Sequence, residues 1–555
     1  MRLRRFAVAG ALGALACALG GAPLRAASKD VDPVAASDAD YRKRLETCDA
    51  DDVAAQRALA AWCLKARLPE RARERFRRVV ELVPDDAEAR AAVGEVLRGD
   101  VWVTRRAARR LDHDARRRAV PEGDVAALLQ VADAALRDRL LDQAEDVYRD
   151  VLALDPANEA ARHALDAEPT TPLERAVVDA LGPAGKSRDR AEAALESAPA
   201  LDPEAIGRWM LFVRARLRRL PHHEGGDVET LRDPACAVRY RVVVNRKGAG
   251  LSLAVLLHGG GPSREVNDGA WDDLRYLAEG PFDVVAIPRV LDDTTGAGWI
   301  VESGPRIVEQ LLHEVLRAHP IDTNRVFLHG YSMGGYGGAY LGALAPDRFA
   351  AVGVGAAGWC SGGARVGNFL HLPVALHIGA EDRESDHVGT SREFRGLLDA
   401  ARAQRPWGYP LEYVEYPGVG HQLPMEDAPR AFAWMAERSR DPDPVRVVWE
   451  PFSTQLYPTH RPWCWWLGAD AFTNDARAEA VVVGDTVHVT TTRGFQGLTL
   501  YLDEDVVDVT HVVNVMQNGK GVFRKVPKAS LATLVRTFAA RNDPELTYAY
   551  AVPLR

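Results

Sequence analysis

The segment Gly330-Tyr331-Ser332-Met333-Gly334 constrains the fold of this chain more than any other part of the sequence. The apolar residues 325–329 before it predict a short buried strand, and the small residues 336–345 after it predict a helix that ends at Pro346. A serine at a sharp strand-to-helix turn has an exposed hydroxyl, and the residues two before and two after it come into close contact. Glycine is therefore expected at both positions. The alternative is a chance glycine-rich turn in an α/β sheet.

Seven apolar runs of strand length alternate with helical stretches between residues 236 and 440. This alternation predicts an α/β fold with a mostly parallel, doubly wound sheet that is covered by helices on both faces. The expected strands are 238–245, 251–257, 282–287, 325–329, 350–355, 373–378 and 411–416, and the expected helices are 271–278, 305–318, 336–345, 391–404 and 429–439. Ligands of such sheets bind beyond the carboxyl ends of the strands, where Ser332 is expected to lie.

A serine hydroxyl becomes a good nucleophile only when a base takes its proton and an acid holds that base in the right tautomer. Both partners are expected after the serine, with the acid before the histidine. Asp382 is the predicted acid because it lies in the turn that leaves the carboxyl end of the strand 373–378. Glu381 and Asp386 are the alternatives, since a small slip in the loop would exchange them with Asp382.

His421 is the predicted base. It follows the strand 411–416 and the segment Pro417-Gly418-Val419-Gly420, whose glycines allow the loop to fold back toward the serine. The alternatives are His371, His377 and His387. Of these, His377 lies inside an expected strand and is interpreted as a core residue, and His387 lacks a comparable turn.

A second glycine-rich loop, His258-Gly259-Gly260-Gly261, follows the buried strand 251–257. Attack on a carbonyl builds negative charge on its oxygen, and backbone amides must already point at that place. We therefore predict an oxyanion hole formed by the amide of Gly259 or Gly260 and by that of Met333. The alternative is a glycine turn without a catalytic role, and His258 is expected to shape the loop.

Two tryptophans follow strands whose carboxyl ends are expected near the serine. Trp299 comes after the strand 282–287, and Trp359 comes after the strand 350–355. Both are candidate pocket residues, with packing beneath a loop as the alternative.

The segment 322–335, together with the His258 loop, Asp382 and His421, resembles the α/β-hydrolase superfamily over about residues 236–440. The closest likeness is to its esterase and prolyl-oligopeptidase-like branches, which include enzymes similar to feruloyl esterases and polyhydroxyalkanoate depolymerases. The resemblance implies hydrolysis of an ester, or less often an amide, through an acyl-enzyme, with neither a metal nor an organic cofactor.

The chain also departs from that pattern. Prolyl oligopeptidases carry a β-propeller, whereas helical residues precede the hydrolase-like region here, which puts peptidase activity in doubt. Only 50 residues separate Ser332 from Asp382, which leaves no room for a large lid and favours an open site for a bulky or polymeric ester.

Residues 40–168 are rich in Ala, Arg, Leu and Glu with apolar residues at helical spacing, which predicts an all-helical region. Residues 72–90 align with residues 144–162, and the match resembles tetratricopeptide repeats. Such repeats either bind a protein partner or dock on the next domain. A helical linker is expected over 169–235, and a β-rich, sandwich-like domain with a late helix is expected over 445–555.

The amino terminus has the pattern of an export signal over residues 1–27, with arginines before a short apolar run that is too short to cross a bilayer. Export predicts a periplasmic or extracellular protein, and Cys17 is a weak candidate for a lipid anchor. No other segment predicts a transmembrane span.

A net charge of −8 with no basic patch argues against a nucleic-acid partner, and no Cys/His spacing indicates a metal site.

These observations favour an exported serine hydrolase that cleaves a small-molecule or polymeric carboxylic ester. Two alternatives remain: a serine peptidase of the prolyl-oligopeptidase type, and a non-catalytic envelope binding protein on a hydrolase scaffold.

Overall fold

The computed structural model describes residues 33–291, 293, 298–359, 365–383, 386–421, 428–453 and 461–554, with only the backbone at 33–37, 428 and 429. The expected export signal, including Cys17, lies outside the described residues. Two compact units divide the chain: one holds Pro221–Glu479 and Thr491–Leu498, and the other holds Asp30–Leu220, Ala480–Thr490 and Thr499–Arg555. Residues 445–555, expected as one domain, thus contribute to both units. Among the described residues, no helix is both long and apolar enough to cross a membrane.

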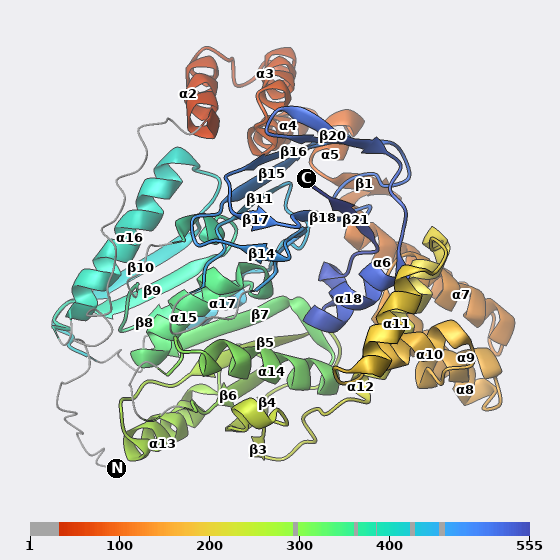
Figure 1. Ribbon diagram of the computed structural model, residues 1–555. Coiled ribbons are helices and arrows are strands. Elements are labelled where there is room, and N and C mark those ends of the chain that lie inside the picture. The colour runs from red at the N-terminus through yellow and green to blue at the C-terminus, as the bar shows by residue number, and fades with distance from the viewer. Residues whose placement is uncertain are drawn as a thin grey trace. The chain divides into compact units, whose positions relative to one another are not determined.

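The first unit is built on an eight-stranded sheet with the order β10-β9-β8-β7-β5-β6-β4-β3 (Figure 1). Neighbouring strands from β5 to β10 pair in parallel, whereas β4 pairs antiparallel with both β3 and β6. The structure therefore confirms an α/β fold with a large, mostly parallel sheet. The strands are β3 (Glu229–Thr230), β4 (Arg239–Val244), β5 (Leu251–Leu257), β6 (Val284–Pro288), β7 (Ile321–Tyr331), β8 (Ala351–Gly355), β9 (Val374–Gly379) and β10 (Leu411–Tyr416).

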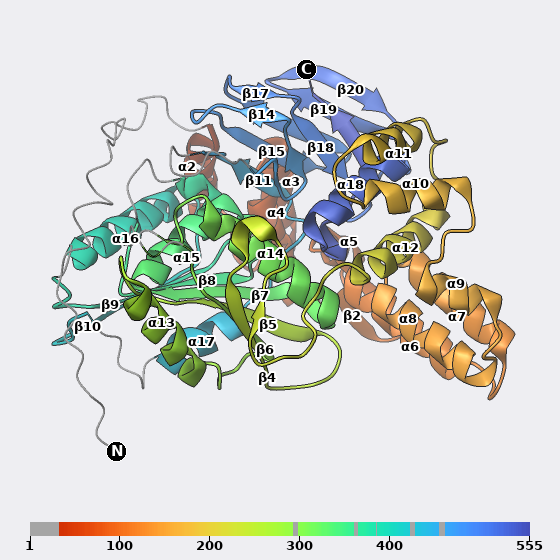
Figure 2. The same ribbon diagram turned by 60° about the horizontal axis from the view of Figure 1, so that its bottom comes forward.

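Helices cover both faces of this sheet because alternate strand residues point to opposite sides. On β5, Leu253, Val255 and Leu257 join one apolar cluster, and Ala254 and Leu256 join the other. The first cluster also contains residues of α14 (Ser303–Ala318), α15 (Met333–Leu344) and α16 (His387–Gln404), and the second contains residues of α13 (Arg264–Asp273) and α17 (Ala428–Ala436) (Figure 2). The expected helix at 271–278 is wrong in its bounds, since α13 begins seven residues earlier.

The chain leaves β5 and β7 in opposite directions. From β5 it passes through α13 to β6 on one side, and from β7 it passes through α15 to β8 on the other side. In sheets of this kind, ligands bind beyond the carboxyl ends of the two strands at such a divergence, because the crossover helices lie on opposite faces. The loop after β5 and the turn after β7, which hold the candidate oxyanion and nucleophile residues, both lie at this place.

The second unit is mainly helical. Its helices are α2 (Pro33–Glu46), α3 (Val53–Lys65), α4 (Pro69–Leu82), α5 (Ala87–Ala92), α6 (Arg105–Arg118), α7 (Val125–Arg137), α8 (Leu141–Leu154), α9 (Glu159–Asp166), α10 (Pro172–Ala180), α11 (Lys186–Glu196), α12 (Ile206–Arg218) and α18 (Leu531–Arg541). In its β-rich part, β19 pairs parallel with β16 and antiparallel with β20, and β18 pairs antiparallel with β21. These strands are β16 (Thr486–Thr491), β18 (Thr499–Leu502), β19 (Val513–Gln517), β20 (Lys520–Lys525) and β21 (Tyr550–Pro553).

Six further short strands lie among the described residues between 446 and 496. They are β11 (Arg446–Trp449), β12 (Trp463–Cys464), β13 (Leu467–Gly468), β14 (Ala471–Phe472), β15 (Ala478–Val483) and β17 (Phe495–Gln496).

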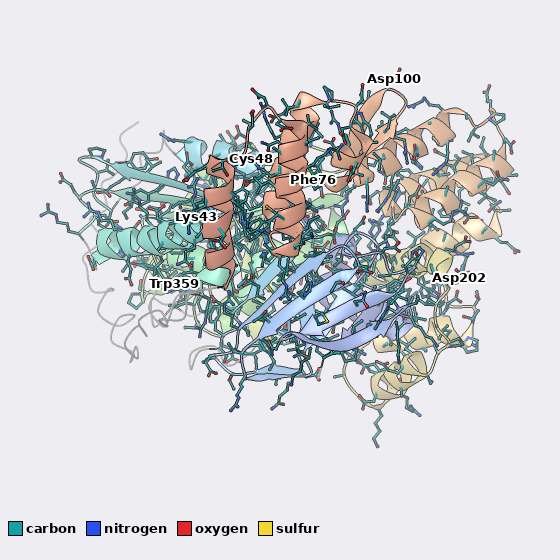
Figure 3. The ribbon with its side chains drawn as sticks, turned by 90° about the horizontal axis from the view of Figure 1, so that it is seen from above. Lys43, Cys48, Phe76, Asp100, Asp202 and Trp359 are labelled. Atoms are coloured by element: carbon teal, nitrogen blue, oxygen red, sulfur yellow. The ribbon has the colours of Figure 1, made fainter. Side chains whose placement is uncertain are left out.

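The helices α3, α4 and α5 repeat as α7, α8 and α9 at an offset of 72 residues. The repeat extends to local geometry, because Arg67 and Arg139, each two residues after the first helix of its set, have φ angles of 59° and 56°. The aromatic rings at Phe76 and Tyr148 are both buried, and Figure 3 labels Phe76 on α4. A duplicated helical unit thus underlies the sequence repeat.

The expectation that residues 40–168 are all helical is wrong at one place. Strands β1 (Glu95–Arg98) and β2 (Val101–Thr104) form an antiparallel hairpin, with Asp100 at its turn (Figure 3). Gly99 has a φ of +58°, which suits the first position of a two-residue hairpin turn. The short Gly-Asp turn between Val-containing segments is the sequence feature that could have indicated it.

Candidate active site

Ser332 occupies the sharp turn between β7 and α15. Its φ of 54° and ψ of −120° are unfavourable for a residue with a side chain. A Cβ on Gly330 would lie 1.9 Å from the carbonyl oxygen of Gly334, and a Cβ on Gly334 would lie 2.1 Å from that of Leu257. Only glycine permits this close approach, so the turn that exposes the serine requires both glycines.

Ser332, His421 and Asp382 form a continuous hydrogen-bonded series. The Oγ of Ser332 lies 2.9 Å from Nε2 of His421, and Nδ1 of His421 lies 2.8 Å from Oδ2 of Asp382. Because the carboxylate of Asp382 can only accept, Nδ1 carries the proton and Nε2 accepts from the serine. Asp382 is fully buried, whereas the imidazole keeps 23% of its surface exposed. The arrangement can take the proton of an attacking hydroxyl and orient the imidazole that receives it.

The loops that hold Asp382 and His421 are bonded to each other. The amide of Glu381 donates to the carbonyl of Val419 over 2.8 Å, and a Cβ on Gly379 would lie 2.2 Å from the carbonyl oxygen of Gly420. Gly418 has a φ of 72°, which allows the return of the chain toward the sheet. The glycines therefore fix the acid and the base at one edge.

The other candidates for acid and base lie elsewhere. Glu381 and Asp386 are exposed, and Asp386 precedes α16 with a φ of 58°. The ring of His377 lies between the hydroxyl of Tyr416 and the carboxylate of Glu412 inside the sheet, as expected for a core residue. The His371 ring contacts the carbonyl of Arg446 at 2.7 Å.

Two residues outside the predicted triad contact His421: Tyr331, and His387, which was an alternative for the base. The hydroxyl of Tyr331 donates to the His421 carbonyl over 2.6 Å, and the ring of His387 stacks on the His421 ring. Nδ1 of His387 in turn lies 2.8 Å from the hydroxyl of Tyr336, one turn of α15 after the serine. Burial and the neighbouring His421 lower the pKa of His387 to about 4, so this ring is neutral near pH 7. Tyr331 could have been noticed as the residue next to the serine, whereas no local pattern indicates that His387 stacks on the base.

The loop 258–261 lies directly against the nucleophile. A Cβ on Gly259 would lie 3.3 Å from Cβ of Ser332 and 3.1 Å from the carbonyl oxygen of Tyr331. Met333 is the first residue of α15, so its amide has no acceptor within the helix. The three predicted amide donors, of Gly259, Gly260 and Met333, thus belong to backbone segments next to Ser332.

His258 has a structural role in this loop. Its Nε2 accepts from the amide of Val290 over 3.0 Å, which places the ring proton on Nδ1, 2.6 Å from the Gly259 carbonyl. Burial lowers the pKa of His258 to about 4 and keeps the ring neutral.

Neither candidate pocket tryptophan faces open solvent. Trp299 is fully buried beneath the loop, where its indole N–H donates to the His258 carbonyl over 2.9 Å. Trp359 packs beside α16 (Figure 3), with its ring against those of Phe369 and Phe394. Both rings are therefore buried against neighbouring groups, and a role as pocket walls stays a prediction.

Solved esterases resemble this chain weakly. A thermostable esterase shares 22% identity over 38% of this chain and 63% of its own length, with a TM-score of 0.29. An S-formylglutathione hydrolase from Agrobacterium tumefaciens shares 17% identity over 38% of this chain and 94% of its own, with a TM-score of 0.32. A ferulic acid esterase from Anaeromyces mucronatus shares 13% identity over 39% and 92% of the two chains, with a TM-score of 0.28. At this level of similarity, none of them indicates a substrate for this chain.

No protein-family model matches the sequence, and no curated protein does either.

The site offers one group of potential metal ligands, Asp382, His387 and His421, whose ligand atoms lie within 4.8 Å of one another. The two imidazoles, however, are nearly parallel, with ring centroids 4.6 Å apart and planes at 18°. The lone pairs of imidazole nitrogens lie in the ring plane, so two parallel rings do not aim at one ion about 2 Å away. The geometry favours a stacked pair over a metal centre.

Proposed function

We propose that this protein is a serine hydrolase that cleaves a carboxylic ester through an acyl-enzyme. The observation that carries the proposal is the hydrogen-bonded series from Ser332 through His421 to Asp382, placed where the chain diverges after β5 and β7. A strained serine with a base, a buried acid and the backbone amides of adjacent segments supplies every group that acyl transfer requires.

The reaction follows from the positions of these groups. Oγ of Ser332 attacks the ester carbonyl carbon while Nε2 of His421 takes the hydroxyl proton, and the carbonyl oxygen becomes an oxyanion facing the glycine loop. Collapse of this intermediate breaks the bond to the alcohol oxygen, which takes the proton from His421. Water then loses a proton to His421 and attacks the acyl-enzyme, releasing the acid and restoring Ser332. Asp382 stabilises the imidazolium throughout.

The short path between nucleophile and acid favours an open site over one covered by a large lid. Of the 49 residues between Ser332 and Asp382, α15, β8 and β9 hold 23, which leaves little chain for a large lid in this interval. This supports an open site and a bulky or polymeric ester. The second candidate function, a serine peptidase, uses the same groups. The kcat/KM values for a panel of aryl esters, acylated sugars and proline-containing peptides separate the two functions, because an esterase prefers the first two classes and a peptidase prefers the third.

Labelling with a fluorophosphonate probe tests the hydrolase proposal against a binding protein. The wild type should carry the probe on Ser332, as located by mass spectrometry of the digested protein. Ser332→Ala should abolish labelling and lower turnover by about a millionfold, the order found when a triad serine is removed. An unlabelled wild type would favour the binding-protein alternative.

The placement in the cell and the role of the helices are further parts of the proposal. The pattern of residues 1–27 supports export to the periplasm or beyond, and fractionation of cells expressing the full chain tests it.

The duplicated helices support tetratricopeptide-like units, which offer a surface for a protein partner.

A further inference from the structure

The side chain of Asn267 joins the glycine loop to the helix beneath it. Asn267 lies on α13 and is fully buried. Its Oδ1 accepts from the Gly261 amide over 2.9 Å, and its Nδ2 donates to Oδ1 of Asp293 over 2.7 Å. The amide of Gly261 is therefore occupied and is not one of the candidate oxyanion donors.

Gly260 packs directly on this side chain. Its φ is +134°, and a Cβ at this position would lie 2.1 Å from Oδ1 of Asn267. The loop can take its course only because residue 260 has no side chain and because residue 267 is short enough to lie beneath it. The two residues thus fit each other sterically.

Asn267 is itself held by charged neighbours. The guanidinium of Arg289 lies 2.7 Å from Oδ1 of Asp293 and 3.0 Å from Oδ1 of Asp268, the next residue of α13. Arg289 follows β6 and is almost fully buried. This network links the loop after β5 to the segment after β6, so the orientation of the Asn267 amide group is fixed from both ends.

We infer that Asn267 is a positioning residue, which holds the loop 258–261 so that the Gly259 and Gly260 amides point at the oxyanion formed on Ser332. The inference rests on the proposed function. A backbone amide that is already oriented toward the oxyanion position needs no reorganisation when negative charge develops there. A displacement of such a group by about 1 Å lowers the rate by about 100-fold.

Replacing Asn267 by alanine tests the inference in the full-length protein. We expect kcat for 4-nitrophenyl acetate to fall by about 100-fold with KM changed less than threefold, because the loop contributes mainly in the transition state. Affinity for a boronic acid, which forms a tetrahedral adduct with the serine, should fall in parallel with kcat. A merely structural role would lower the melting temperature without this coupled loss.

Asn368→Ala is the matched control. Asn368 is equally buried, and its Nδ2 donates to the carbonyls of Ala343 and Glu450 over 2.8 and 3.0 Å, away from the loop. Its loss should lower the melting temperature but leave kcat within threefold. If folded Asn267→Ala retains wild-type kcat and boronic acid affinity, the inference is wrong while the proposed function stands. If the wild type neither labels with fluorophosphonate nor hydrolyses esters, the proposed function fails and the inference falls with it.

A double-mutant cycle with Gly260→Ala gives an independent test. The methyl group should clash with Asn267 and lower kcat more than 100-fold in the wild type, but less than tenfold when added to Asn267→Ala, which vacates the space. Gly248→Ala controls for backbone strain alone, since Gly248 has a φ of +141° and no atom within 4 Å of its Cβ position. If the effects of Gly260→Ala and Asn267→Ala on kcat are additive, the contact between these two residues does not determine the position of the loop.

Discussion

The imidazole of His387 stacks on the imidazole of His421, with ring centroids 4.6 Å apart and planes at 18°. His387 begins α16, and its Nδ1 is bonded to the hydroxyl of Tyr336 on α15. The stack therefore connects the candidate base to the helix that starts at the nucleophile. It restricts the rotation of an imidazole that must face Ser332 on one side and Asp382 on the other.

Removal of this ring by His387→Ala should lower kcat by about 10- to 100-fold, because His421 then samples orientations that do not meet the serine. His387→Phe keeps a flat ring and should recover most of the activity, whereas His387→Asn keeps only the acceptor for Tyr336 and should not. Steady-state kinetics on one ester checks all three variants. His511→Ala, a change at an exposed histidine, is the control, and full activity of His387→Ala would contradict a positioning role for the stack.

Asp382→Asn should lower kcat by about 10,000-fold while leaving the fold intact. The NH2 group of the new amide can donate to Nδ1, which favours the His421 tautomer with its proton on Nε2, and that nitrogen then cannot accept from Ser332. Glu381→Gln and Asp386→Asn change the two exposed alternatives and should stay within threefold of the wild type. A large loss in either of these variants, with Asp382→Asn active, would move the acid to the other position.

Gly330→Ala should prevent folding, since its methyl group would lie 1.9 Å from the Gly334 carbonyl oxygen within a buried turn. We expect insoluble protein on expression. Gly396→Ala is the matched change at an open position of α16, with no atom within 4 Å, and should raise the free energy of unfolding by about 0.5–1 kcal/mol because alanine favours helix. Soluble, active Gly330→Ala would contradict the tight turn.

Acid should destabilise the first unit through His329, which is buried in β7 with its ring 4.9 Å from that of Phe432. Burial and the nearby His377 lower the pKa of His329 to about 3. The unfolded chain therefore binds a proton below about pH 6.5, whereas the folded chain does not until about pH 3. Stability present above pH 6.5 is lost as the pH falls toward 3, by up to about 1.4 kcal/mol per pH unit.

Urea unfolding at pH 7, 6 and 5 checks this dependence. His329→Asn removes the titrating ring, so its free energy of unfolding should fall less steeply with pH than that of the wild type. Parallel slopes in the two proteins would show that other groups dominate the acid response.

Much of the fold could be predicted because it depends on local patterns. The apolar run of β5 and the exact bounds of β10 follow from strand-length segments between helical ones. Ser332 could be located because the steric demands of its turn fall on two neighbours in the sequence, Gly330 and Gly334. Asp382 and His421 could be located from the strands that they follow. In the structure, His421 lies within hydrogen-bond distance of both Ser332 and Asp382. The catalytic roles of these residues are part of the proposal.

The structural features that the sequence did not reveal depend on contacts between residues that are far apart in the sequence, or on weak local patterns. Trp299 and Trp359 follow the expected strands, but the burial of both rings could not be read from the sequence, because it depends on distant groups such as the His258 carbonyl and the Phe394 ring. The bounds of α13 and the hairpin of β1 and β2 were missed because polar helices and short hairpins carry weak periodicity.

The sequence by itself determined where strands end and which turn must carry a serine, since backbone sterics and hydrophobic period act between near neighbours. Only the tertiary structure decided that His387 stacks on His421, that Tyr331 contacts its carbonyl, and that Asn267 occupies the Gly261 amide. These contacts join residues whose distance in space is set by the packing of the whole sheet and its helices, and no local pattern of amino acids encodes that distance.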